Sequence, residues 1–265
     1  MSFEKTTFSE RLKSMLSVDL RRLLISPFTY IMAGIFLCVP ILMLVMTTMM
    51  DGMVSVDPQT GVETVMKGFD SVWQALAQPT GSSAAMDMSL VSMCNINMIY
   101  FGMAVFVCVF IGADFRSGYV KNLFTVRAKR TDYVISKSVI CITACMVYVL
   151  IFFAGILLGG AISGLPFDTM GVSVFQISMC LICKVLLCLV FVPIYIAVST
   201  FAKQRTWLSI LGSLCVGMLF FSMIPMISPL DTGILNVIMC LCGGVGIAIG
   251  LGAVSNMILK KTNII

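Results

Sequence analysis

Residue types that enzymes use for chemistry are sparse in this sequence, and their absence excludes whole classes of reaction. The 265 residues contain no histidine, so Ser–His and Cys–His nucleophiles and HExxH metal helices are excluded. No GxxxxGK[ST] stretch occurs, so this chain does not bind ATP through a P-loop. We therefore expect that the chain is not an enzyme and holds no cofactor of its own.

The 11 cysteines do not form a pattern typical of a metal site or a disulfide framework. Most lie inside apolar runs, where cysteine packs as a small hydrophobe. Cys180 and Cys183 form a CxxC pair, but no second pair accompanies them. We expect no metal site, and helix packing is the preferred interpretation of this pair.

Lys184 is the one charge that lies well inside an apolar run. One interpretation is a snorkelling lysine whose ammonium reaches the outer headgroups. The other is a cation that faces a water-filled pathway or a subunit interface, since no intramembrane acid in the sequence pattern neutralises it. Both interpretations stay open, and Lys184 is a possible pathway residue.

Residues 112–137, GADFRSGYVKNLFTVRAKRTDYVISK, combine aromatic and basic side chains. Phe115, Tyr119 and Phe124 can lie on the apolar face of a short helix, with basic residues around it. One interpretation is a loop that binds headgroups and sets topology. The other is a docking element that passes the movement of a cytoplasmic partner to the membrane.

The elements that position these residues are membrane-spanning helices. The sequence is 59% hydrophobic and 11% charged, with a mean hydropathy of +1.06, whereas soluble domains carry about 25% charged residues. Several apolar runs approach or exceed the roughly 18 residues of a spanning helix. We predict an all-α membrane protein with six transmembrane helices, at residues 28–50, 93–113, 134–158, 174–198, 207–227 and 233–258, the fifth of which is broken by Pro225.

Three further segments are predicted outside the spans. Residues 1–27 are expected to form a cytoplasmic interfacial helix, amphipathic and capped by Thr7 and Glu10. Loop 51–92 is predicted to be external, and the helical spacing around Trp73 indicates a short helix on the membrane surface. Loop 114–133 and the tail 259–265 are predicted to be cytoplasmic.

The basic residues lie almost entirely on one side of this six-span arrangement. Fifteen of the 17 belong to the N-terminal segment, the loop 114–133 with its flanks, the turn before span five, or the C-terminal end. The positive-inside rule therefore places both termini in the cytoplasm. The net charge of +5 is explained by this topology, so we expect no nucleic-acid partner.

Three glycine pairs have GxxxG spacing within predicted spans or at their ends, and we expect them to permit close helix packing. The pairs are Gly155/Gly159, Gly160/Gly164 and Gly246/Gly250.

The stretch 112–137 resembles the permeases of type-2 ABC exporters. The resemblance rests on an acidic, an aromatic and a basic residue, then glycine, then a basic residue, followed by Arg130, Tyr133 and Lys137 leading into a span. In that family an interfacial helix precedes six spans, and the loop between spans two and three forms a coupling helix that docks on a separate ATPase. By position, the resemblance implies coupling contacts by Asp114, Phe115, Arg116, Gly118, Lys121 and Leu123.

The resemblance also implies partners and a class of substrate. Two cytoplasmic ATPase subunits, which carry ATP and Mg²⁺, would drive a pathway formed by this chain and a second permease subunit, identical or paralogous. Well-known members have folded external elements between spans five and six, whereas the long external loop here follows span one. Small permeases of the peptide-toxin, lantibiotic-immunity and bacitracin-resistance kind in bacterial plasma membranes are more similar, which suggests export of an amphipathic or hydrophobic peptide. The alternatives are a non-transporting scaffold or sensor that recruits a cytoplasmic partner, and an ion-independent secondary carrier.

Overall fold

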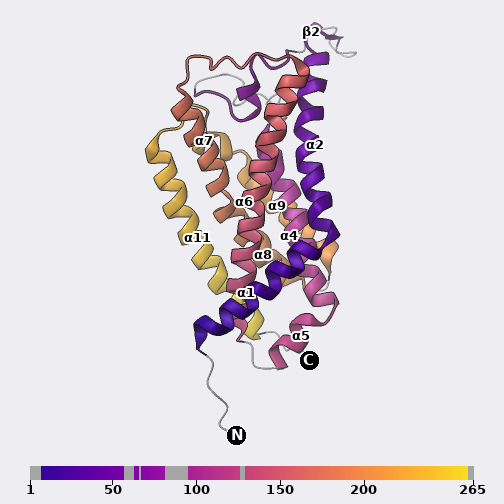
Figure 1. Cartoon of the computed structure of the whole chain (residues 1–265), viewed down its shortest axis with the longest axis vertical. Helices are drawn as coiled ribbons and strands as arrows, with labels where there is room; N and C mark the ends of the chain where they lie inside the picture. Colours follow the sequence, from indigo (N-terminus) through magenta and orange to yellow (C-terminus); the bar gives the residue numbers. More distant parts are fainter. Residues whose placement is uncertain are drawn as a thin grey trace.

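The computed structural model describes residues 7–56, 63–65, 67–80, 95–125, 129–203 and 205–261. These residues form an elongated bundle of helices (Figure 1). The one departure from the expected all-α class is a small antiparallel hairpin of β1 (Val54–Val56) and β2 (Glu63–Val65). Much of loop 51–92, the start of predicted span two at 93–94, and the chain ends 1–6 and 262–265 lie outside the described residues.

Five helical segments of the described chain are long and apolar enough to cross a membrane, and each overlaps a predicted span. They are α2 (Pro27–Met49), α4 (Ile99–Arg116) preceded by the 3₁₀ helix η3 (Ile96–Met98), α6 (Arg130–Ser163), α7 (Val174–Leu186) with α8 (Cys188–Ala202), and α11 (Ile234–Lys261). Helix α6 exceeds its predicted bounds at both ends. Its 34 residues extend about 51 Å at 1.5 Å per residue, so it is longer than a hydrocarbon core of about 30 Å.

The predicted span 207–227 is interrupted in the structure. It consists of α9 (Thr206–Phe221), which has 16 residues, and the four-residue α10 (Ile224–Ile227). The break falls just before Pro225, which lacks a backbone N–H and disfavours helical geometry in the residue before it. Helix α9 is apolar but shorter than the other candidate spans.

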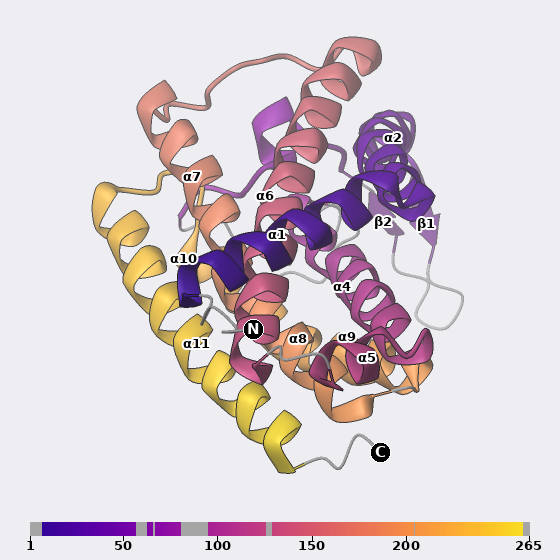
Figure 2. The same ribbon diagram turned by 60° about the horizontal axis from the view of Figure 1, so that its bottom comes forward.

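The N-terminal helix α1 (Phe8–Ile25) begins with the predicted capping box, in which Thr7 and Glu10 each bind the other's backbone N–H. Hydrogen bonding of the Glu10 carboxylate to the Thr7 backbone N–H, and then to the Thr7 side chain, lowers the pKa of Glu10. Figure 2 shows that α1 lies across one end of the bundle, over α6. The short helix α5 (Tyr119–Thr125) lies at the same end, whereas the β hairpin lies at the opposite end (Figure 1).

Close packing of α2 against α6 depends on the first predicted glycine pair. A Cβ atom on Gly155 would lie 2.5 Å from Pro40 Cγ and 2.6 Å from the Leu37 carbonyl oxygen. A Cβ atom on Gly159 would lie 2.9 Å from the Ile41 Cα atom. The prediction of close packing at this pair is confirmed. It is wrong for Gly246 and Gly250 within the described chain, because nothing lies within 4 Å of a Cβ atom built on either residue.

A cap segment, residues 67–80, covers the end of the bundle opposite α1. The short helix predicted there is a single 3₁₀ turn, η1 (Val72–Ala75). Its apolar residues Phe69, Val72 and Leu76 are buried against the bundle, so the prediction that this segment rests on the membrane surface is wrong. The backbone N–H of Val72 donates to the Pro166 carbonyl, and Trp73 Nε1 donates to the Phe167 carbonyl at 3.3 Å.

The cap segment is also tied to the loop between α10 and α11. The Thr80 hydroxyl donates to Asp231 Oδ1 at 2.6 Å, and the Thr80 backbone N–H donates to the same oxygen at 3.0 Å. The Leu230 N–H donates to the Gln78 carbonyl. The cap segment therefore joins the α6–α7 loop to the α10–α11 loop.

This tie should weaken in acid. Burial by itself raises the pKa of Asp231, but the hydrogen bonds from Thr80 outweigh it, and the pKa is lowered from its ordinary value of 3.8. A depressed carboxyl pKa stabilises the fold above its unfolded value, and this contribution is lost as the pH falls through the folded value. Thermal unfolding should show wild type to be more stable than Asp231→Asn at pH 7, with a difference that shrinks below about pH 3.8. A difference that does not change with pH would contradict this.

Candidate functional site

The stretch singled out in the sequence forms a sharp turn and a short helix at the end of α4. Helix α4 ends at Arg116, Gly118 adopts a φ of +70°, and α5 begins at Tyr119. A left-handed φ is strained for residues with a Cβ atom, so the turn favours glycine. Gly118 therefore sets the direction in which α5 leaves α4.

The six predicted coupling residues divide into exposed and buried groups. Arg116 and Lys121 are exposed, and Gly118 and Leu123 are partly exposed. Asp114 has no exposed surface and Phe115 is 9% exposed. In this structure only the exposed and partly exposed residues are accessible to a partner, whereas Asp114 and Phe115 hold the base of the turn in place.

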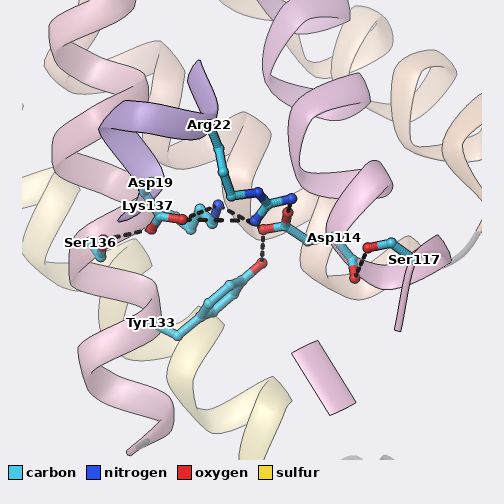
Figure 3. A network of polar contacts seen from close by, with 7 residues as sticks. All are labelled: Asp19, Arg22, Asp114, Ser117, Tyr133, Ser136 and Lys137. Carbon is cyan, nitrogen blue, oxygen red and sulfur yellow. Dashed lines mark hydrogen bonds and ion pairs between the residues drawn. The ribbon is translucent and has the colours of Figure 1, made fainter. Parts of the chain in front are cut away.

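Asp114 lies at the centre of a buried network of charged and polar groups (Figure 3). Its carboxylate forms ion pairs with Arg22 Nη2 at 2.7 Å and with Lys137 Nζ at 2.7 Å. The Tyr133 hydroxyl donates to the same carboxylate at 3.2 Å. One acid at the end of α4 thus joins α1, which carries Arg22, to α6, which carries Tyr133 and Lys137.

Asp19 of α1 is the second acid of this network. It accepts from Lys137 Nζ at 2.8 Å and from the Ser136 hydroxyl at 2.7 Å. Arg22 Nη1 lies 3.9 Å from it. Lys137 therefore bridges the two buried carboxylates, and the four charges of Asp19, Arg22, Asp114 and Lys137 sum to zero.

Aromatic rings surround the two cations and link them to α5. The Arg22 guanidinium lies 4.2 Å from the Tyr119 ring centroid, and Lys137 Nζ lies 4.4 Å from that of Phe110. Burial lowers the pKa of Arg22, but Asp114 outweighs this effect and the pKa is raised. Burial, and then the charge of Asp19, raise the pKa of Tyr119. Arg22 is therefore charged and Tyr119 neutral at pH 7, so the contact is a cation–π interaction.

Two further contacts fix the start of α6 at this end of the bundle. Arg11 Nε of α1 lies 3.0 Å from Asp132 Oδ2. Arg130 donates to the Leu259 carbonyl near the end of α11. The first two turns of α6 therefore connect α1, α4 and α11, and α5 is attached to this joint through Asp114 and Tyr119.

Lys184 lies elsewhere in the bundle and is fully buried near the end of α7. Its Nζ atom donates to Asn97 Oδ1 at 2.8 Å. Because the ammonium has no exposed surface, the snorkelling interpretation is wrong for this structure. The structure does not bring Lys184 together with the six predicted coupling residues.

The class of this protein follows from a match to a known family. A family model described as ABC-2 family transporter protein matches residues 18–220. The chain belongs to the ABC-2 transporter family. No curated protein and no solved structure matches the chain.

The match to the ABC-2 family includes the whole buried network, from Asp19 in α1 to Lys137 in α6. This match shows that the chain is a permease-type membrane component of an ABC transporter. The resemblance to type-2 ABC permeases is therefore confirmed at the level of the family. Among the described residues no group of three or more His, Cys, Asp or Glu side chains could hold a metal ion.

Sequence reasoning missed Asp19, Ser136 and Asn97 as partners in this ABC-2 permease. Asp19 carried a detectable signal, because it shares the helical stripe of Met15 and Leu23 that is buried in the structure. An acid within an apolar stripe points to a buried cation. Ser136 and Asn97 gave no such signal, since neither their type nor their spacing distinguishes them from ordinary polar residues.

Proposed function

We propose that this chain is the membrane subunit of an ATP-driven exporter of the type-2 ABC kind. Two permease subunits, identical or paralogous, form the pathway, and two cytoplasmic ATPase subunits bind at the end that carries α1 and α5. Hydrolysis of ATP with Mg²⁺ takes place in those partners, and this chain contributes neither cofactor. The family match supports the class, and the partners and their number belong to the proposal.

One observation carries this proposal: the exposed basic residues at the end of α4 and on the short helix α5 are attached rigidly to three longer helices. Arg116 and Lys121 face solvent, whereas Asp114, directly before this surface, is held by α1 and α6. A force on α5 therefore acts on the ends of α1, α4 and α6 together. Coupling of this kind needs a rigid joint, because a flexible one would absorb the movement.

The proposed topology has six crossings with both termini in the cytoplasm. The pair α9 and α10 supplies the fifth crossing, although α9 alone is only about 24 Å long at 1.5 Å per residue. Bilayer thinning or a neighbouring subunit accommodates such a short crossing. The cap segment and β hairpin are then external, and α1 lies in the cytoplasmic interface in contact with anionic lipid headgroups of a bacterial plasma membrane.

The proposed substrate is an amphipathic or hydrophobic peptide, such as a toxin or antimicrobial. This choice is supported by the resemblance to small peptide-exporting permeases and by the apolar character of the helices. Nothing in the described chain resembles a nucleic-acid site, and no nucleic acid takes part in the proposed activity.

Charge reversal at the end of α4 and on α5 tests the docking role. We expect Lys121→Glu combined with Arg116→Glu to lower co-purification of the cognate ATPase at least tenfold, because two cations that face the partner become anions. The measurement is affinity purification of the tagged permease from membranes in which both subunits are expressed. ATPase activity per permease should fall in parallel.

Lys260→Glu is the matched control, since Lys260 is an exposed lysine of a different helix, α11. This variant should retain the ATPase at the wild-type level. Equal retention by all variants would reject α5 as the docking element. A complex that forms normally but exports nothing would favour a non-transporting scaffold, and export in the absence of any ATPase would favour a secondary carrier.

A further inference from the structure

The buried Lys184 ammonium lies beside a one-residue irregularity in the long helical segment 174–202. Helix α7 ends at Leu186 and α8 begins at Cys188. The Lys184 carbonyl accepts a hydrogen bond from the Tyr100 hydroxyl at 2.7 Å. Leu187 keeps right-handed helical dihedrals, and its carbonyl accepts from the N–H groups of both Val190 and Phe191, so the irregularity is a local 3₁₀-type distortion of a kind that often marks a functional hinge.

The surroundings of Lys184 do not neutralise its charge. In the part of the chain that the structure describes, the only hydrogen-bond partner of Nζ is the neutral Asn97 amide, and no carboxylate lies within 4.0 Å. The ionisable groups near it are the thiols of Cys180, Cys183 and Cys240. A buried ammonium with one neutral partner is costly in a low-dielectric bundle, and such residues in membranes commonly mark ligand pathways.

The wall beside Lys184 is rigid and aromatic. The Tyr100 ring stacks on Phe191 with a centroid distance of 4.6 Å, and the Tyr195 hydroxyl donates to the Tyr100 carbonyl at 3.1 Å. Tyr100, Tyr195 and Asn97 are each 2% exposed or less. This combination of a positive group and an apolar aromatic wall is complementary to an amphipathic anion.

Lys184 lies near the loop that is bound to the cap segment. Cys180 lies one helical turn before it and contacts the Ser228 carbonyl at 3.7 Å. Ser228 belongs to the α10–α11 loop, whose next residues bind Gln78 and Thr80 of the cap segment. Lys184 is therefore about one turn deeper in the bundle than the loop that the cap segment holds.

We propose that Lys184 and Asn97 form an anion site that binds the carboxylate of an amphipathic molecule during transport. The ammonium exchanges its contact with Asn97 for the carboxylate when the helices around the irregularity at Leu187 separate. This inference rests on the proposed function, and it narrows the substrate to molecules that carry a carboxylate, from either a peptide C terminus or a fatty acid. No covalent step is involved.

The test measures binding to the purified full chain in lipid nanodiscs without ATP. The probe is 11-(dansylamino)undecanoic acid, compared with its methyl ester, which has the same apolar body without the charge. A charge-assisted contact in a buried site predicts that the acid binds roughly ten- to a hundredfold more tightly than the ester. Lys184→Met should reduce binding of the acid to the level of the ester, whereas Lys184→Arg should retain the preference.

A further variant keeps the test decisive if Lys184→Met does not fold. Lys184→Gln retains a donor for Asn97 but carries no charge, and it should also lose the preference for the acid. Competition experiments identify the source of the carboxylate. If an apolar peptide displaces the probe as its free acid but not as its C-terminal amide, the natural ligand is a peptide. If laurate alone displaces the probe, the natural ligand is a fatty acid. Both outcomes support the site.

Equal binding of acid and ester by wild type, or an acid preference that survives in Lys184→Met and Lys184→Gln, would overturn the inference. The result is independent of the docking experiment, because no ATPase is present. Loss of the anion site with normal ATPase docking would reject this inference alone. A failure of ATPase docking would not change the result of the binding experiment.

Discussion

A chain carrying Lys137→Met should lose about 3–5 kcal/mol of its free energy of unfolding, the usual cost of removing one partner from a buried ion pair. Lys137 is 0% exposed and bridges Asp19 at 2.8 Å and Asp114 at 2.7 Å. Without the ammonium, Asp19 keeps only the Ser136 hydroxyl and the more distant Arg22. The measurement is thermal or denaturant unfolding of the purified protein in lipid nanodiscs.

The control for this prediction is Lys13→Met, which removes an exposed lysine from α1 and should change stability by less than about 0.5 kcal/mol. Asp19→Asn combined with Lys137→Met should cost less than the sum of the single variants, because the double variant removes a cation and its anion together. If Lys137→Met behaves like Lys13→Met, the network does not stabilise the joint, and the rigid attachment of α5 would have to be abandoned.

Gly155→Ala is expected to destabilise the bundle by about 1–3 kcal/mol, in the range of other overpacking substitutions. The added methyl group would lie 2.5 Å from Pro40 and 2.6 Å from the backbone oxygen of Leu37. A backbone atom in a helix cannot move aside as a flexible side chain can, so α2 and α6 must separate. Unfolding in nanodiscs measures the effect, and a reduced yield of folded protein should accompany it.

Gly250→Ala is the matched control for Gly155→Ala, since it makes the same change within a long helix, α11. Nothing lies within 4 Å of the new Cβ atom, and alanine is favoured over glycine in a helix interior by up to about 1 kcal/mol. This variant should be neutral or slightly stabilising. Equal destabilisation by both variants would mean that the close approach of α2 to α6 is not the cause of the loss of stability in Gly155→Ala.

Local patterns in the sequence predicted most of the helices. Hydropathy runs located five helices that can cross a membrane, because an apolar run of sufficient length has few alternatives to a buried helix. The Thr7–Glu10 capping box was predicted correctly, since both partners lie within one turn. The break in span 207–227 at Pro225 was also predicted correctly, because a proline within a helix removes a backbone hydrogen bond whatever the hydropathy around it.

The sequence predicted only part of the candidate site. The turn at Gly118 and the exposed cations Arg116 and Lys121 on either side of it follow from residue types within a short stretch, and they were located correctly, while their coupling role stays a prediction. That Asp114 and Phe115 are buried depends on how α1 and α6 pack against α4, which a local pattern does not contain. The positive-inside rule counted Arg22 and Lys137 as signals of orientation, whereas in the structure both neutralise buried acids.

Hydrophobic length and charge are local quantities, so they were enough to predict a multi-helix membrane protein with a basic, aromatic segment at one end. The pairing of the buried charges, in contrast, depends on how the helices pack. Asp19 and Lys137 are 118 residues apart in the chain, and Asn97 and Lys184 are 87 apart. In an apolar bundle the few buried polar groups must find one another or remain unsatisfied, and packing of distant helices alone selects the partners.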